Sequence, residues 1–212
     1  MNIKVCGITT MKQLNQLEGL GVDFAGLIFH KKSPRYAGHT LAASEVKNAD
    51  LDLKTVGVFV NETYEEIMKV VEEYKLDAVQ LHGDESPYLC GKLADQVEVI
   101  KAFGIGAGQE GKIDYMVAEY DEACDYYLFD TKNNGASGGT GEKFDWKLLK
   151  DAQVEKPFFL SGGIGPNDIP LLREFKHPDF YGIDINSQFE KSPGIKDMAL
   201  LLAFTKSFRR KG

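Results

Sequence analysis

The stretch PFFLSGGIGPND, residues 157–168, places an apolar run directly before two glycines and a turn-forming Gly-Pro-Asn-Asp segment. Such a run followed by such a loop is typical of a buried strand that leads into a helix. Similar runs recur along the rest of the chain: IKVCG, FAGLIF, TVGVFV, AVQLHG, VIKAFG, YYLFDT and FYGIDI. The chain is therefore predicted to repeat one strand-and-helix unit eight times.

Between these runs, apolar residues recur at helical spacing. The clearest examples are residues 10–20, 63–74 and 197–208, in each of which the apolar side chains share one helix face. Strands that alternate with helices pair in parallel, with the helices as crossovers. Eight units in 212 residues leave roughly 26 residues per unit, close to the compact limit for a (β/α)8 barrel.

A doubly wound open sheet is the alternative architecture. It would normally carry a G-x-G-x-x-G nucleotide motif after the first strand, whereas CGITTMK contains a single glycine. Glycines gather instead after the sixth and seventh predicted strands. We therefore predict an α/β chain with one domain over residues 1–212, a (β/α)8 TIM barrel.

Composition limits the classes of partner and the compartment. The net charge of −7 argues against a nucleic-acid or anionic-membrane surface. The three cysteines, Cys6, Cys90 and Cys124, are scattered without a CxxC pair, which argues against a disulfide framework or structural zinc. The sequence shows neither a signal-peptide pattern nor a stretch of membrane-spanning length. We expect a reduced, cytoplasmic protein with no nucleic-acid or membrane partner.

In a barrel of this kind, chemistry is carried by residues at the carboxyl ends of the strands. Cys6, His82 and Asp130 each end a predicted strand, and Arg35 lies in the second strand–helix loop. Each has a plain structural alternative: a small buried hydrophobe for Cys6, a loop residue for His82, a turn cap for Asp130 and a surface charge for Arg35. The sequence places no second histidine or carboxylate at ligand spacing from His82, so no metal site is predicted.

The glycines after the late strands predict a phosphate site. Loops that let the backbone approach a ligand, followed by helix N-termini, are the phosphate-binding device of this barrel. The glycines concerned are Gly138, Gly139, Gly141, Gly162 and Gly163, and the helix after the last two is expected to start near Asn167.

Taken together, these segments resemble the phosphoribosylanthranilate isomerase family of the tryptophan pathway. The matching motifs run in family order from residue 3 to about 204: KVCGIT, GLIF, SPRY, VGVFVN, VQLHGDE, KAF, FDT, GGTGEKFDW, LSGGIGPNDI, DINSQFE and PGIKD. The resemblance implies an Amadori rearrangement of N-(5-phosphoribosyl)anthranilate to 1-(2-carboxyphenylamino)-1-deoxyribulose 5-phosphate. It implies no cofactor, no metal and a phosphosugar substrate; we expect a monomer or a homodimer.

The resemblance also implies roles for single residues. Cys6 matches the family's general base, Asp130 its general acid and Arg35 the arginine that holds the anthranilate carboxylate. His82 matches a substrate-contacting histidine. The remaining substrate-binding positions are Gly141, Gly162, Gly163, Asn186 and Ser187. Where the family often has Ser-Gly after the last strand, this chain has Ser187 followed by Gln188, which removes the freedom of a glycine.

Independently of the resemblance, the types of these residues suit the chemistry. Ring opening needs a proton on the ring oxygen, which Asp130 would deliver, and a thiolate can remove the sugar C–H proton. Because side chains alternate along a strand, Lys4 should face the barrel interior with Cys6, and Gln80 should do so with His82. Asp184 on the last strand is a further candidate for this inner face. We expect the Lys4 ammonium to bring the pKa of Cys6 below the free-thiol value of about 8.5.

Three rival functions remain at this level. Indole-glycerol-phosphate synthase has a similar barrel and phosphate site, but it resembles a longer chain with an N-terminal extension, whereas this sequence opens on the first strand. A metal-dependent sugar-phosphate epimerase would need more histidine and aspartate ligands at strand ends. A non-catalytic phosphometabolite binder would explain the glycines and Arg35, but not an acid and a thiol facing each other.

Overall fold

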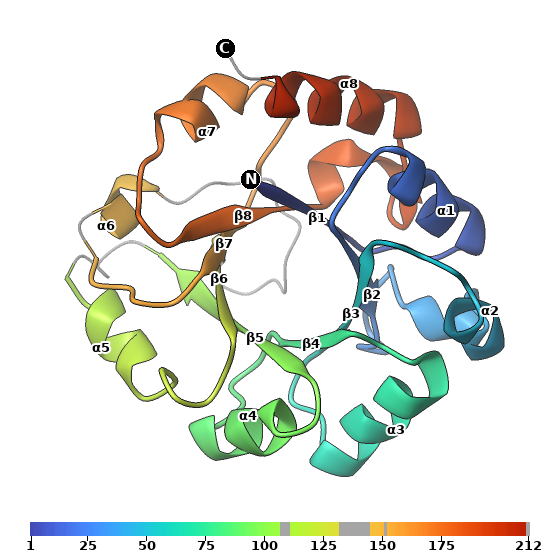
Figure 1. The fold of residues 1–212 in the computed structure, drawn as a ribbon, viewed down its shortest axis with the longest axis horizontal. Helices are drawn as coiled ribbons and strands as arrows, with labels where there is room; N and C mark the ends of the chain where they lie inside the picture. The colour runs from blue at the N-terminus through green and yellow to red at the C-terminus, as the bar shows by residue number, and fades with distance from the viewer. Residues whose placement is uncertain (107–110, 132–144, 151, 211–212) are drawn as a thin grey trace.

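The computed structural model describes residues 1–106, 111–131, 145–150 and 152–210. These residues form a closed barrel of eight parallel strands, in which each strand bonds to the next in chain order and the last returns to the first (Figure 1). The predicted (β/α)8 barrel is confirmed. All eight strands fall on the predicted runs: β1 (Asn2–Cys6), β2 (Phe24–Ile28), β3 (Lys54–Phe59), β4 (Ala78–Leu81), β5 (Glu98–Ile105), β6 (Tyr126–Thr131), β7 (Phe158–Leu160) and β8 (Phe180–Ile185).

Helices form a ring outside the strands (Figure 1). The three helices predicted from apolar spacing correspond to α1, α3 and α8, and each begins where a polar side chain (Thr10, Thr63 or Asp197) accepts a hydrogen bond from the first turn. The helices are α1 (Met11–Gly19), α2 (Ala43–Lys47), α3 (Tyr64–Tyr74), α4 (Pro87–Ala94), α5 (Ile113–Ala118), α6 (Lys147–Lys150), α7 (Ile169–Glu174) and α8 (Met198–Arg209). Within the described part of the chain, no helix combines the length and the apolar character needed to cross a bilayer.

The segment between β8 and α8 departs from the simple repeat. After β8 the chain makes a 3-10 turn over Ser187–Phe189 and then a small antiparallel hairpin of β9 (Glu190–Ser192) and β10 (Ile195–Lys196). The sequence did not predict this hairpin, because strands of two or three residues are too short to display an alternating pattern. It lies on the side of the barrel mouth formed by β1 and β8.

The barrel interior changes character from bottom to top. Apolar side chains fill its lower part, among them Phe24, Ile100, Leu128 and Phe159. One layer higher, the inward-facing residues are polar although fully or almost fully buried: Lys4, Gln80 and Asp184. The mouth of the barrel therefore lies above a buried polar layer, and that layer lies above an apolar one. Charges in the buried polar layer interact more strongly than they would in water.

Candidate active site

The carboxyl ends of the barrel strands surround a cavity of about 210 Å³. Every predicted site residue that the structure describes lines it: Cys6, Arg35, His82, Asp130, Gly162, Gly163, Asn186 and Ser187. Gly138, Gly139 and Gly141 lie outside the described residues. Segments from six strand ends thus converge on one cavity, as the barrel architecture predicts.

Cys6 ends β1 and is 5% exposed. Its neighbour on β2 is Gly26, and the thiol fits only because that residue has no side chain. A Cβ atom at Gly26 would lie 2.8 Å from the Cys6 Sγ and 3.0 Å from the Cys6 Cα. This role of Gly26 could not be predicted from the sequence, because it depends on the register of two strands.

We predict that Gly26→Ala destabilises the fold by about 1–3 kcal/mol, because the added methyl group forces β1 and β2 apart or displaces the thiol. The matched control is Gly91→Ala in α4, where an added Cβ would have its nearest neighbour at 4.0 Å. Alanine in a helix interior is favoured over glycine, so the control should be neutral or stabilising by up to about 1 kcal/mol. Urea unfolding of both variants measures the difference, and equal stabilities would refute the close-packing argument.

An ion pair lies one layer below the thiol. The Lys4 Nζ is 3.0 Å from the Asp184 Oδ2, and both side chains are buried. The predicted inward orientation of Lys4 and Asp184 is confirmed. Burial acts to lower the pKa of Lys4, but the Asp184 carboxylate and the Cys6 thiolate raise it on balance. Lys4 therefore stays an ammonium beneath Cys6.

The expectation that Lys4 would bring the pKa of Cys6 below the free-thiol value was wrong. Burial has the largest effect and raises the pKa of Cys6 above its ordinary value. Lys4 acts in the predicted direction, and Lys196 adds to it, but the Asp184 carboxylate opposes them. The charge of Lys4 is shared between a carboxylate and the thiol, so it does not outweigh desolvation.

On the other side of the cavity, His82 and Asp130 form a pair. The His82 Nε2 lies 3.3 Å from the Asp130 Oδ2. The Gln80 Nε2 lies 2.8 Å from the His82 Nδ1, which confirms that Gln80 in β4 and His82, directly after it, share the inner face. The Gln80 amide thus fixes the orientation of the imidazole, so that Nε2 faces Asp130. The structure thus gives His82 a direct contact with the candidate acid.

The glycine turn after β7 approaches that acid closely. Gly162 and Gly163 have φ angles of +88° and +64°, a conformation that favours glycine. A Cβ atom at Gly162 would collide with Thr131 and lie 2.9 Å from the Asp130 Oδ1. The following helix, α7, starts at Ile169, close to the predicted start near Asn167, with Pro170 in its first turn. Its residues do not line the cavity. The glycine turn therefore faces the cavity, whereas α7 does not.

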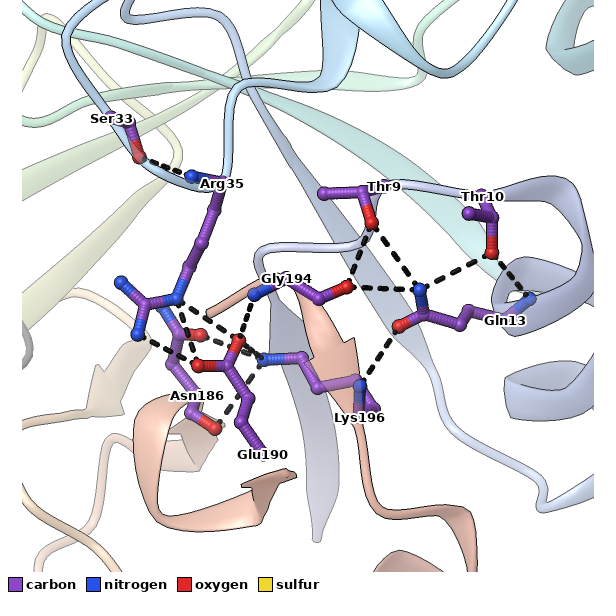
Figure 2. A network of polar contacts seen from close by, with 9 residues as sticks. All are labelled: Thr9, Thr10, Gln13, Ser33, Arg35, Asn186, Glu190, Gly194 and Lys196. Atoms are coloured by element: carbon purple, nitrogen blue, oxygen red, sulfur yellow. Dashed lines mark hydrogen bonds and ion pairs between the residues drawn. The ribbon is translucent and has the colours of Figure 1, made fainter. Parts of the chain in front are cut away.

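Arg35 is held by a partner that the sequence did not reveal. Its Nε donates to both oxygens of Glu190 at 3.0 Å, and its Nη2 donates to the Glu190 Oε2 at 2.7 Å (Figure 2). Lys196 also contacts this carboxylate, with Nζ 2.8 Å from Oε1, and donates to the Asn186 Oδ1 at 2.7 Å. Both missed residues lie in motifs of the resemblance, DINSQFE and PGIKD, but belong to the unpredicted hairpin.

Burial and the charged partners act in opposite directions on the pKa values of this cluster. The Glu190 carboxylate would have a raised pKa from burial alone, but Arg35 and Lys196 lower it below its ordinary value. Burial lowers the pKa of Lys196, and the Glu190 carboxylate counters part of that effect. The cluster contains two cationic side chains and one carboxylate.

The described residues contain no group of three or more histidine, cysteine, aspartate or glutamate side chains arranged to hold a metal ion. The two other cysteines lie away from the cavity, Cys90 in α4 and Cys124 before β6. Burial raises the pKa of Cys90 to about 11 and that of Cys124 to about 12. Both behave as small buried hydrophobes.

Comparison with known proteins gives a consistent result. The family model described as "PRAI: N-(5'phosphoribosyl)anthranilate (PRA) isomerase" matches residues 3–207. The N-(5'-phosphoribosyl)anthranilate isomerase of Parabacteroides distasonis is 41% identical over 206 residues, which cover 96% of this chain and 91% of that one. The crystal structure of phosphoribosyl anthranilate isomerase from Thermotoga maritima superposes with a TM-score of 0.83 and 32% identity, covering 99% of this chain and 98% of that one.

A further solved structure of a phosphoribosyl anthranilate isomerase contains a ligand, reduced 1-(o-carboxyphenylamino)-1-deoxyribulose 5-phosphate. It superposes on this chain with a TM-score of 0.79 and 30% identity, covering 99% of this chain and 98% of that one.

Proposed function

This chain belongs to the N-(5'-phosphoribosyl)anthranilate isomerase family, and from that membership we propose that it catalyses the Amadori rearrangement of N-(5-phosphoribosyl)anthranilate. The product is 1-(2-carboxyphenylamino)-1-deoxyribulose 5-phosphate, so the reaction is an intramolecular aldose–ketose isomerisation in tryptophan biosynthesis. The observation that carries the proposal is the placement of a thiol, Cys6, and a carboxyl group, Asp130, around one cavity.

The proposed mechanism uses these two groups in sequence. Asp130 donates a proton to the ring oxygen of the furanose, the ring C–O bond breaks, and the nitrogen lone pair forms a C=N bond to C1. The Cys6 thiolate then removes the proton from C2, and that electron pair forms the C1–C2 double bond of an enolamine. The Cys6 thiol then returns a proton to C1, and the C2 hydroxyl gives its proton to the Asp130 carboxylate, which yields the ketone at C2 and restores both groups. No electron leaves or enters the substrate, so the mechanism needs no redox cofactor.

The remaining site residues would bind the two ends of the substrate. Arg35 would hold the anthranilate carboxylate, since a guanidinium suits that group. Gly162, Gly163, Asn186 and Ser187, in the segments after β7 and β8, would receive the phosphate, together with Gly141. His82, in contact with Asp130, would orient the acid. We propose that residues 1–212 act as one catalytic domain, as a monomer or homodimer in the cytoplasm, with a phosphosugar as substrate and neither nucleic acid nor membrane as partner.

The test is to incubate the purified protein with freshly made phosphoribosylanthranilate and follow the loss of substrate fluorescence. The proposal expects catalytic turnover that is unaffected by prior dialysis against EDTA. Binding of the substrate without any turnover would instead favour the non-catalytic binder.

We predict that Arg35→Ala weakens binding of the carboxylated substrate by about 10-fold or more, because a hydrogen bond to a charged group contributes about 1.5–3 kcal/mol. A ligand without the carboxyl group should bind equally well to both proteins. Isothermal titration of the two ligands measures the effect. Equal losses for both would mean that Arg35 supports the fold and not the carboxylate.

A further inference from the structure

The guanidinium of Arg35 presents two edges that could each bind a carboxylate. Glu190 occupies one of them, the edge formed by Nε and Nη2, at 2.7–3.0 Å. Figure 2 shows the third nitrogen, Nη1, pointing away from Glu190. Arg35 lines the cavity, whereas Glu190 is not among the lining residues. The edge formed by Nη1 and Nη2 is therefore the one left for a ligand.

Glu190 is itself held in place. Its side chain is 4% exposed, and its Oε1 accepts hydrogen bonds from the Lys196 Nζ at 2.8 Å and from the Gly194 N at 3.2 Å. The Gly194 carbonyl is tied in turn to the start of α1, by the Thr9 hydroxyl at 2.7 Å and the Gln13 amide at 3.0 Å (Figure 2). Glu190 is thus fixed to the barrel by contacts that do not involve Arg35.

These contacts argue against a second interpretation, in which Glu190 occupies the place of the substrate carboxylate on Arg35 and leaves when the substrate binds. If Glu190 moved away, the fully buried ammonium of Lys196 would lose its carboxylate partner. Leaving a buried charge unpaired is strongly unfavourable. Within the described residues, the Arg35 side chain donates hydrogen bonds to Glu190 alone, so the direction of its guanidinium depends on that carboxylate.

We propose that Glu190 is a positioning residue for substrate selection: it fixes the Nε–Nη2 edge of Arg35 so that the Nη1–Nη2 edge faces the cavity and selects a substrate with an aryl carboxylate. This inference rests on the proposed function. The cluster of Arg35, Lys196 and Glu190 has a net charge of one positive unit, which matches a single carboxylate. Holding the guanidinium in advance removes the entropic cost of ordering it when the ligand binds.

The decisive variant is Glu190→Gln, which keeps the side-chain shape. An amide can keep its oxygen facing Lys196 and Gly194, which both donate to Oε1. Its NH2 group then takes the place of Oε2 and faces the Arg35 Nη2, so that two donors oppose each other. We expect KM for phosphoribosylanthranilate to rise by about 10-fold, with kcat within a few-fold of wild type. An unchanged or lowered KM would overturn the proposal.

A double-mutant cycle separates positioning from a general effect on the hairpin. In an Arg35→Ala background, Glu190→Gln should change KM no further, because the residue through which it acts is absent. A full additional loss in that background would mean that Glu190 acts through Lys196 and the hairpin, and would refute the proposal.

A binding experiment keeps the test independent of turnover. Calorimetry would compare reduced 1-(o-carboxyphenylamino)-1-deoxyribulose 5-phosphate with the same compound lacking the carboxyl group. Glu190→Gln should weaken the first by about 10-fold and leave the second unchanged. Equal changes for both ligands would refute the positioning role. If wild type bound both ligands but turned over no substrate, the proposed function would fail while this comparison still decided the role of Glu190.

Discussion

Asp130→Asn is expected to lower kcat by about 100-fold or more while KM changes by less than a few-fold. The amide has almost the same size as the carboxyl group and still accepts a hydrogen bond, but it cannot deliver a proton to the ring oxygen. The Asp130 Oδ1 accepts the Thr131 N–H at 2.8 Å, a contact that the asparagine oxygen can preserve. The fold around the variant should therefore remain intact, and the loss should lie in the chemical step.

The matched control for this variant is Asp84→Asn. Asp84 is an exposed aspartate in the loop after β4, close in sequence to His82 but absent from the cavity lining. Steady-state kinetics of both variants decide the outcome. An Asp130→Asn enzyme within a few-fold of wild type, or a control with an equal loss, would remove Asp130 from the mechanism.

Cys6→Ser is expected to cost about 10²–10⁴-fold in kcat, because a serine hydroxyl is not ionised at neutral pH and cannot replace a thiolate base. In the wild-type enzyme, burial raises the pKa of Cys6, so the thiol is mostly neutral at pH 7. The thiolate fraction, and with it kcat/KM, should then rise up to tenfold for each pH unit above 7. The midpoint should lie above the free-thiol value of about 8.5.

Direct titration of the thiol checks this pH dependence. Iodoacetamide alkylation of Cys6 is measured against pH in a Cys90→Ser, Cys124→Ser background. Since the Lys4 ammonium lowers the pKa of Cys6, Lys4→Met should move the midpoint higher and slow the alkylation at pH 8. A midpoint below about 8.5 in the parent protein, or no shift with a folded Lys4→Met variant, would contradict the assignment.

The sequence predicted those features that depend on short-range patterns. Alternation along single strands was sufficient to place Lys4 beside Cys6 and Gln80 beside His82 on the inner face. The features it did not predict depend on which residues meet across strands. Gly26 makes room for the thiol only because β1 and β2 pair in one register. Likewise, the pKa of Cys6 could not be foreseen without knowing that Asp184 shares the charge of Lys4.

The Glu190–Arg35 contact could not be predicted from the sequence, for a second reason. The two residues are 155 positions apart, and Glu190 belongs to a hairpin too short to show a period. The sequence alone suggests a solvated charge for a glutamate in such a segment. In the structure Glu190 is 4% exposed and accepts five hydrogen bonds from described residues.

Residues from the two ends of the chain contact each other at this site, which affects how the protein folds during translation. Lys4 meets Asp184, Arg35 meets Glu190, and Thr9 meets Gly194 across 185 positions. Contacts of such long sequence separation form only after a large loop has closed, so they come late in folding. A nascent chain still lacking β8 would hold Lys4 and Arg35 without their carboxylates. Lys4 beneath the Cys6 thiol, and Arg35, thus acquire their carboxylate partners only when β8 and the hairpin after it join the barrel.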